Sequence, residues 1–225
     1  MDTVPVIGGT GALGFAVGLR LARAGAPIAI GSRDAGRAQE AAARMRDRLP
    51  EARVEGLDNQ AAAARGPIVL MCVPFRAQSE TLTNLGSALR SGQILVDATV
   101  PLAAAVAGKA TRLLGVPQGS AAQQAQEMVP DGVTVVSALH TVSAPVLDDL
   151  ERDLDEDVLI AGDSKQAKRR VAELVELVRG LRPVDCGRLE QARHIEGLTP
   201  LLISVNVNNK THAGVRITGL TEPLW

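Results

Sequence analysis

The 225-residue sequence predicts an α/β fold built on a doubly wound parallel sheet, followed by a small C-terminal α/β appendage. Short apolar runs alternate with longer helical runs in the first half of the chain, which is typical of βαβ units. The run Ile68–Val73 is continuously apolar, as expected for a strand buried on both faces. A glycine-rich turn at Gly8–Gly14 connects the first expected strand to the first expected helix. Together these features predict a Rossmann-type domain, with right-handed crossovers that place helices on both faces of the sheet.

The first strand and the first helix show the two periodicities most clearly. Thr3–Ile7 is an apolar run that stops at the glycine turn, although Pro5 lacks the N–H that a central strand normally donates. Ala12–Ala24 carries apolar side chains at helical spacing and ends at Gly25. The same alternation continues along the chain. Further strands are expected at Pro27–Ile30, Arg53–Gly56, Ile68–Val73 and Gln93–Ala98, and further helices at Asp34–Leu49, Gln60–Ala64 and Gln78–Leu89.

The pattern loosens after Pro101 into a loop rich in Ala and Gly and then resumes. We place a domain boundary near residue 162, so that residues 1–162 form the Rossmann domain and residues 163–225 form a small C-terminal domain. This second part is too small to stand alone, and we expect it to pack on the first part or on a second subunit. Expected elements here are the helices Ser120–Met128, Ser164–Arg179 and Leu189–Val207 and the strands Val133–Ser137, Val158–Ala161 and Arg182–Asp185.

The composition argues against several classes of function. The 24 basic and 25 acidic side chains leave a net charge of -1, so no strong attraction to nucleic acid or to an anionic membrane is expected. With no Tyr, two Phe and one Trp, no stacking surface for single-stranded nucleic acid is expected. Cys72 and Cys186 form no disulfide framework, and His140, His194 and His212 have no metal-ligand spacing, so no metal is expected. The N-terminus has no signal-peptide pattern and no apolar run is long enough to span a membrane, so we expect a cytoplasmic protein.

The glycine-rich turn contains the pattern G-x-G-x-x-G at Gly9, Gly11 and Gly14, between an expected strand and an expected helix. Gly9 permits a tight turn, Gly11 lets the backbone approach a pyrophosphate, and Gly14 lets the helix pack close to the sheet. The helix N-terminus offers free N–H groups and a partial positive charge to phosphates, and Thr10 adds a hydroxyl. The turn therefore predicts dinucleotide binding.

The end of the second expected strand indicates which dinucleotide is bound. NAD sites carry an Asp or Glu at this point to accept from the ribose hydroxyls, whereas this chain has Ser32 and Arg33. Arg33 supplies a planar guanidinium matched to phosphate, and Arg37 lies one helical turn further on. Asp34 is expected to cap the following helix. This arrangement favours the 2′-phosphate of NADP.

Two apolar corners follow the fourth and fifth expected strands, Val73–Phe75 with the sequence V-P-F and Val100–Leu102 with the sequence V-P-L. Ligands of open α/β sheets lie beyond the carboxyl ends of the strands, so both corners are placed to border a ligand. Apolar corners on both sides predict a cleft that is poor in water, which suits hydride transfer.

Further motifs follow in a fixed order along the chain. GGTGALG and GSR are shared by many dinucleotide enzymes, whereas SALHTV, LRPVDCG and LTPLL are much more specific. With these motifs, the chain from Val6 to Leu220 resembles the NADPH-dependent coenzyme F-420 reductases, a family also called F-420H2:NADP oxidoreductases. The resemblance implies an oxidoreductase that catalyses reversible hydride transfer between NADP(H) and the deazaflavin coenzyme F-420, its co-substrate. It also implies that the small C-terminal domain closes the deazaflavin cleft.

The resemblance also implies which residues contact each cofactor. His140 would orient the deazaflavin, and no acid–base residue is required because the cofactors carry the hydride chemistry. The other residues bordering the deazaflavin would be Val100, Pro101, Val142 and Ala213. On the NADP side, Gly9, Gly14, Val73 and Pro74 are expected from the turn and the first corner. The resemblance adds Thr10, Gly11, Ala12, Leu13, Ser32, Arg33 and Arg37 for the phosphates and ribose, and Phe75, Leu102 and Ala144 for the rest of the cofactor.

The sequence leaves two alternatives open. One is an NADPH-dependent reductase of a small carbonyl or imine, which would place a Lys, Asp or Tyr to protonate its product. Lys210 is the only candidate for that role that we identify. The other alternative is a non-catalytic redox sensor that binds NADP. The apolar LTPLL stretch predicts a core helix or a subunit interface. We therefore expect a homo-oligomer, and specifically a homodimer.

Overall fold

A parallel sheet of six strands forms the centre of the computed structural model, which describes residues 1–221 and 224–225. The strand order is β3-β2-β1-β4-β5-β6, and each neighbouring pair is parallel. Chain order reverses between β1 and β4, which is the point where doubly wound sheets bind their ligands. The predicted fold class is confirmed. The strands are β1 (Val4–Ile7), β2 (Ile28–Ser32), β3 (Val54–Asp58), β4 (Ile68–Met71), β5 (Ile94–Asp97) and β6 (Thr134–Ser137).

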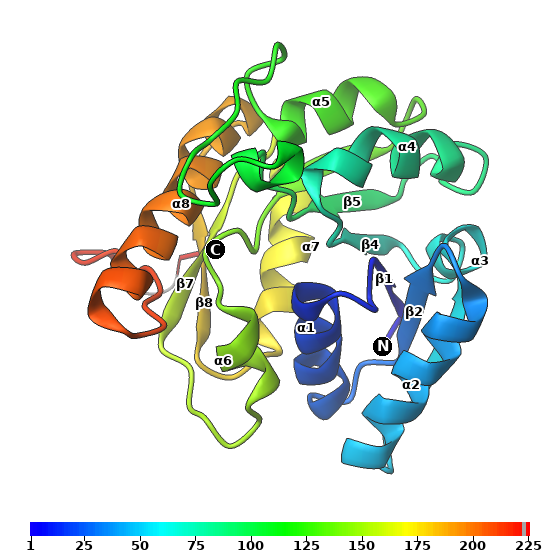
Figure 1. Ribbon diagram of the computed structural model, residues 1–225. Helices are drawn as coiled ribbons and strands as arrows, with labels where there is room; N and C mark the ends of the chain where they lie inside the picture. The colour runs from blue at the N-terminus through cyan, green and yellow to red at the C-terminus, as the bar shows by residue number, and fades with distance from the viewer. Residues whose placement is uncertain (222–223) are drawn as a thin grey trace.

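Helices cover both faces of this sheet (Figure 1). Successive side chains of a strand point to opposite faces, so Val6 joins the hydrophobic core on one face while Ile7 joins the core on the other. The first face packs against α1 (Ala12–Arg23), α2 (Ala35–Arg48) and α7 (Lys165–Glu176), and the second against α3 (Asn59–Ala63), α4 (Phe75–Leu85) and α5 (Ala121–Met128).

A second, two-stranded parallel sheet consists of β7 (Glu156–Ile160) and β8 (Leu181–Asp185), with α7 as the crossover between them. The predicted boundary near residue 162 assigns β7 to the first domain, whereas in the structure β7 pairs with β8. An antiparallel bridge between Ser137 and Ala161 connects the two sheets.

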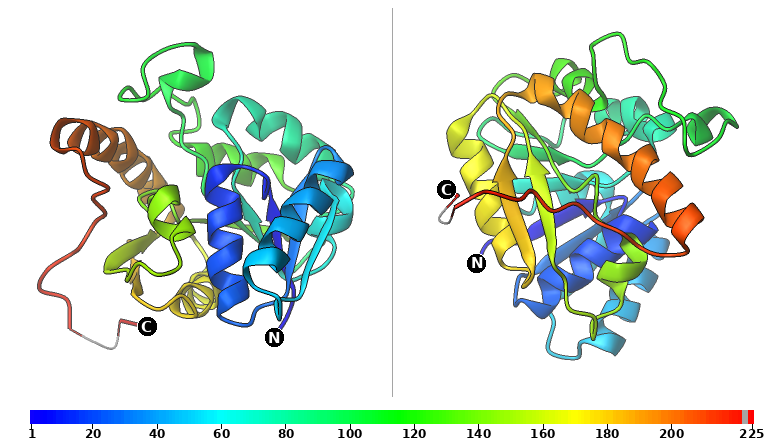
Figure 2. Two further views of the ribbon diagram at one scale, coloured as in Figure 1. Left: turned by 60° about the horizontal axis from the view of Figure 1, so that its bottom comes forward. Right: turned by 90° about the vertical axis from the view of Figure 1, so that its left-hand side faces the viewer.

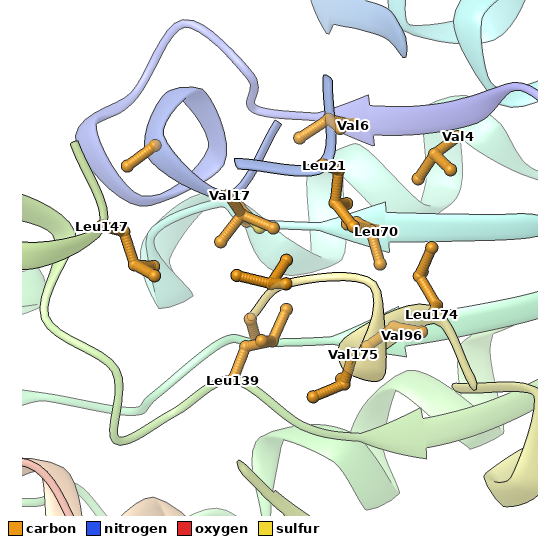
Figure 3. Close-up of a cluster of buried hydrophobic side chains, with 14 of the residues drawn as sticks. Val4, Val6, Val17, Leu21, Leu70, Val96, Leu139, Leu147, Leu174 and Val175 are labelled. Atoms are coloured by element: carbon orange, nitrogen blue, oxygen red, sulfur yellow. The ribbon is translucent and has the colours of Figure 1, made fainter. Parts of the chain in front are cut away.

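The two sheets share one hydrophobic core through α7. Figure 3 shows Leu174 and Val175 of α7 close to Leu70 and Val96 of the large sheet, with Val17 of α1 beside them. These side chains are almost completely buried. The expected C-terminal part therefore packs on the first part over a continuous apolar interface.

The chain ends in a long helix and an extended segment that lies across the second sheet (Figure 2). The helix is α8 (Ala192–Asn209), preceded by the 3-10 turn η2 (Leu189–Gln191). We call the residues after it, 210–221 and 224–225, the C-terminal strap. Asp157 on β7 donates its N–H to the Val215 carbonyl at 2.7 Å, and the Trp225 indole donates to the Pro183 carbonyl at 2.9 Å. None of the helices in the described part of the chain is long and apolar enough to cross a membrane.

Several elements differ from the expectation. The helix expected from Gln78 begins at Phe75, because Pro74 occupies the N-cap position with extended backbone, and it ends at Leu85. Two short helices were not expected, η1 (Ala103–Val106) and α6 (Ala144–Asp148). Pro5 does lie in a central strand. The pairing of β1 with β4 starts only at Val6. Because proline has no N–H to donate, the β1–β4 ladder is shorter at this end.

Candidate functional site

A cleft of about 690 Å³ opens at the carboxyl ends of β1, β2 and β4. This is where the strand order reverses, the place at which open α/β sheets bind ligands. Residues predicted from three separate motifs meet in it, namely Thr10, Gly11, Ser32, Arg33, Arg37, Val73 and Pro74. The cleft also contains side chains that the sequence analysis did not assign to a site: Asn59, Arg76, Glu80 and Thr81.

The turn between β1 and α1 has the geometry that its glycines predict. A Cβ atom on Gly14 would lie 2.6 Å from the Gly8 carbonyl oxygen, and one on Gly9 would lie 2.8 Å from the Val6 oxygen. Neither position tolerates a side chain without movement of the backbone. Gly8 itself has a φ of 77°, a conformation that residues with a Cβ rarely adopt.

The first turn of α1 is open to the cleft. Its N-cap is Gly11, which has no side chain to accept from the first N–H groups of the helix. Ala12 and Leu13 follow as the first helical residues, with Ala12 exposed and Leu13 packed partly against the core. Free N–H groups at a helix N-terminus form a ready site for phosphate.

The end of β2 makes the cleft basic. Ser32 is buried, and its hydroxyl accepts the N–H of Asp34 at 3.2 Å, whereas Arg33 and Arg37 are exposed. The Asp34 carboxylate caps α2 by accepting from the N–H groups of Gly36 at 2.9 Å and Arg37 at 3.3 Å, as expected. Within residues 1–221 and 224–225, its one ion pair is with Arg37 at 3.9 Å. The residue that directly follows the strand is Arg33, in place of the Asp or Glu that accepts from ribose hydroxyls in NAD sites.

Cys72 follows β4 at the edge of the cleft and is buried. Burial raises the pKa of its thiol to about 12, and the Asp97 carboxylate acts in the same direction. Because the thiolate is the nucleophile, Cys72 is an inert thiol at neutral pH, as expected.

The other predicted residues lie in segments that follow β4, β5 and β6 and in the C-terminal strap, and we call them the second group. None of them lines the 690 Å³ cleft. This group comprises Phe75 at the start of α4, Val100, Pro101 and Leu102 after β5, His140, Val142 and Ala144 after β6, and Ala213 in the C-terminal strap.

The C-terminal strap reaches this second group through a side-chain contact. The hydroxyl of Ser143 and Nδ1 of His212 lie 3.3 Å apart, within hydrogen-bond distance. The neighbouring Ala213 donates its N–H to the side-chain oxygen of Asn206 at 2.7 Å. Ala213 is thus brought close to the Val142–Ala144 segment, although the two are far apart in the sequence.

His140 is buried at this edge, with only 5% of its surface exposed. Neither ring nitrogen forms a hydrogen bond within the part of the chain that the structure describes. Burial lowers the pKa of the imidazole to about 4, while the Thr99 backbone acts in the opposite direction. The ring is therefore neutral at physiological pH, with one N–H donor and one acceptor. Leu139, directly before it, has a φ of 70°, which is rare for a branched side chain and sets the direction of the loop.

A buried polar network fixes the elements around the end of β5. The Asp97 carboxylate accepts from the side-chain amide of Gln78 at 2.7 Å and from the N–H of Thr99 at 2.9 Å. Burial raises the pKa of Asp97 to about 6, although both partners lower it. Gln78 also donates to the Ala121 carbonyl at 3.0 Å and accepts from Gln124 at 2.8 Å.

Glu196 of α8 completes this network. Its carboxylate accepts the N–H groups of Ala121 and Ala122, the first residues of α5, at 3.0 and 3.1 Å. Burial raises the pKa of Glu196 to about 8, and the nearby Asp97 carboxylate adds to the shift. The network therefore joins β5, α4, α5 and α8.

The fold and the cleft define a dinucleotide-binding protein of the doubly wound α/β class. Residues 3–101 match the family model described as NADP oxidoreductase, coenzyme F420-dependent. The chain is 41% identical over 223 residues to the F420-dependent NADP reductase of Methanothermobacter marburgensis, covering 97% of this chain and 99% of the relative. It is 40% identical over 222 residues to the enzyme of the same name from Methanocaldococcus jannaschii, covering 96% and 98%. The chain therefore belongs to the family of F420-dependent NADP oxidoreductases.

A solved structure agrees with this assignment. A candidate F420-dependent NADP reductase from Arthrobacter sp. FB24 superimposes with a TM-score of 0.80 at 27% sequence identity, covering 97% of this chain and 99% of that one. The predicted family is confirmed, and with it the prediction of an oxidoreductase that uses NADP(H) and coenzyme F-420 (F420).

Proposed function

We propose that this protein transfers a hydride reversibly between NADP(H), held in the 690 Å³ cleft, and the deazaflavin ring of coenzyme F-420, held by the second group of residues. The observation that carries the proposal is the basic cleft. It combines an open helix N-terminus at Gly11 with Arg33 and Arg37, and the Asp34 carboxylate beside these arginines is engaged in capping α2.

For the NADP side, we propose that the turn binds the pyrophosphate and that the end of β2 binds the 2′-phosphate. Backbone N–H groups at a helix N-terminus suit the first role, and planar guanidinium groups suit the second. The turn residues are Gly9, Thr10, Gly11, Ala12, Leu13 and Gly14, the 2′-phosphate residues are Ser32, Arg33 and Arg37, and the rest of the cofactor would lie along Val73, Pro74, Phe75, Leu102 and Ala144.

The residues present also suit a flat deazaflavin ring beside the nicotinamide. Val100, Pro101, Val142 and Ala213 would supply apolar contacts that exclude water. Neither ring nitrogen of the buried His140 forms a well-aligned hydrogen bond within the described structure, although the Thr99 backbone acts on its pKa. At least one ring nitrogen is therefore available to a heterocycle with carbonyl and N–H groups. When bound, the two cofactors supply the hydride chemistry themselves. The protein's part is to align the rings and to keep water away from them.

Residues 163–225, as the small C-terminal domain, would close the deazaflavin cleft. The hydrogen bond between Ser143 and His212 supports this role because it ties the C-terminal strap to the loop after β6. Exposed apolar side chains on α8, Leu201 and Val207, support a homodimer that buries them. Both cysteines are free, which agrees with a reducing compartment such as the cytoplasm.

The test is to mix the protein with NADPH and oxidised coenzyme F-420 and to follow the deazaflavin absorbance. We expect the absorbance to bleach, and more slowly with NADH than with NADPH. A protein that binds NADPH without any bleaching would contradict the proposal and point to an NADP-binding sensor. Turnover of a small carbonyl or imine in place of the deazaflavin would support the other alternative, which family membership does not favour.

A further inference from the structure

Arg76 lies in the first turn of α4 and lines the same cleft as Arg33 and Arg37. The three arginines reach the cleft from different elements, since Arg33 and Arg37 follow β2 and Arg76 follows β4. In the sheet, β1 lies between β2 and β4 (Figure 1). The arginines therefore approach the cleft from its two sides.

The Arg76 guanidinium forms no hydrogen bond and no ion pair with any described residue of the chain. Glu80 lies one helical turn further on and also lines the cleft, yet no ion pair within 4.0 Å joins the two side chains. Several other surface arginines are paired, as Arg48 is with Asp148 at 2.7 Å, so position in the cleft, rather than the missing ion pair alone, distinguishes Arg76. Arg37 has only the 3.9 Å contact with Asp34. Guanidinium groups that converge on one concave surface are matched to an anionic ligand.

The start of α4 adds a second positive feature on the same side of the cleft. Its N-cap is Pro74, whose side chain cannot accept a hydrogen bond from the helix. The partial positive charge of this helix end is therefore not offset by a capping oxygen.

We propose that Arg76 is a specificity-determining residue that contacts the 2′-phosphate of NADP(H) from the α4 side of the cleft. This inference rests on the proposed function, and it adds a residue that follows a different strand from the other two arginines. A phosphate monoester carries close to two negative charges and three acceptor oxygens, so it can accept from guanidinium groups on two sides. A 2′-hydroxyl offers no such charge, and its binding leaves the three cations uncompensated.

The experiment compares the binding of 2′,5′-ADP and 5′-AMP, which differ only in the 2′-phosphate, by calorimetry. We expect Arg76→Ala to weaken 2′,5′-ADP about tenfold, or about 1.4 kcal/mol, and 5′-AMP less than about twofold. Arg76→Lys keeps the charge and should recover part of the loss. Arg90→Ala is the matched control, because it removes the same charge from an exposed residue. Arg90 lies just before β5, at the amino ends of the strands, whereas the cleft lies at their carboxyl ends. It should leave both affinities unchanged.

Two results would overturn the inference. Equal weakening of both ligands by Arg76→Ala would assign Arg76 to the adenosine rather than to the phosphate, and unchanged binding would make it a solvated surface residue. Arg33→Ala separates this failure from failure of the proposed function. If Arg33→Ala removes the preference for 2′,5′-ADP and Arg76→Ala does not, only the inference falls. Equal binding of 2′,5′-ADP and 5′-AMP by the wild-type protein would contradict both the inference and the proposed function.

Discussion

The hydroxyl of Thr199 on α8 donates a hydrogen bond of 2.9 Å to the carbonyl oxygen of His140. This bond ties the last helix to the loop that carries the buried imidazole. Glu196, three residues before Thr199 and so on the same face of α8, holds the start of α5. One face of α8 thus positions two segments that follow different strands of the large sheet.

Thr199→Val should disturb the loop without removing any proposed cofactor contact. The lost hydrogen bond is worth about 0.5–1.5 kcal/mol, so we expect kcat with coenzyme F-420 to fall roughly two- to tenfold. The affinity for NADPH should not change. Steady-state kinetics and NADPH titration of the variant measure both quantities. Thr199→Ser keeps the hydroxyl and should restore kcat, whereas a Val variant with wild-type kinetics would show that the bond has no positioning role.

His140→Ala should slow turnover or weaken deazaflavin binding while leaving NADPH binding nearly unchanged. One or two hydrogen bonds to the ring would be lost, which corresponds to roughly a three- to thirtyfold effect on kcat/KM for coenzyme F-420. Because the pKa of the ring is about 4, the contribution of His140 should be constant from about pH 6 to pH 8. Unchanged kinetics of the variant would reduce His140 to part of the scaffold.

Arg33→Ala should weaken NADPH binding far more than NADH binding, because the lost contact is to the phosphate that only NADPH carries. A charge-assisted hydrogen bond contributes about 1.5–3 kcal/mol, so the expected loss is on the order of 10- to 100-fold for NADPH. Fluorescence titration of both nucleotides gives the ratio directly. If both affinities fell by the same factor, Arg33 would be assigned to the shared part of the two cofactors.

Glu196→Gln should flatten the dependence of stability on pH. Burial raises the pKa of Glu196 in the folded protein to about 8 from its ordinary value of 4.5. Between these values the unfolded chain releases this proton and the folded chain keeps it, so the free energy of unfolding falls as the pH rises. The expected fall is on the order of 1–3 kcal/mol from this group.

Urea unfolding at about pH 5 and about pH 8.5 measures that fall in both proteins. The variant should lose less stability across this interval than the wild type. A smaller decline remains in both because burial also raises the pKa of Asp97, to about 6. Parallel pH profiles for the two proteins would show that Glu196 ionises at its ordinary pKa.

Local sequence patterns predicted the large sheet and the basic cleft well. The glycine turn and Ser32–Arg33 are short contiguous motifs at strand ends, and the parallel order of the sheet brings such ends together. The pairing of β7 with β8 was not predicted, because an apolar run such as Val158–Ala161 does not specify which strand it pairs with. The contact of Arg76 with the cleft was missed because the helix was expected to start at Gln78, which left Arg76 in a loop.

The polar network around Asp97 illustrates a different limit. Gln78, Asp97 and Glu196 belong to three elements and follow no common spacing in the sequence. Nothing in an isolated helix or strand indicates that a carboxylate will be buried there, since charged side chains are usually exposed. Only the tertiary arrangement shows that each of these three side chains has hydrogen-bond partners in the interior.

The packing of α7 has a consequence for how the enzyme can adapt to its ligands. Because Val175 and Leu70 belong to the same core, rotating one sheet against the other would expose apolar surface at about 25 cal/mol per Å². Rigid-body hinge motion is therefore disfavoured, and adjustment falls to peripheral segments, the loop of residues 103–119 and the C-terminal strap. A redesign for bulkier electron acceptors should begin with the exposed positions of these segments, because Ala103, Val215 and Trp225 pack against the interior.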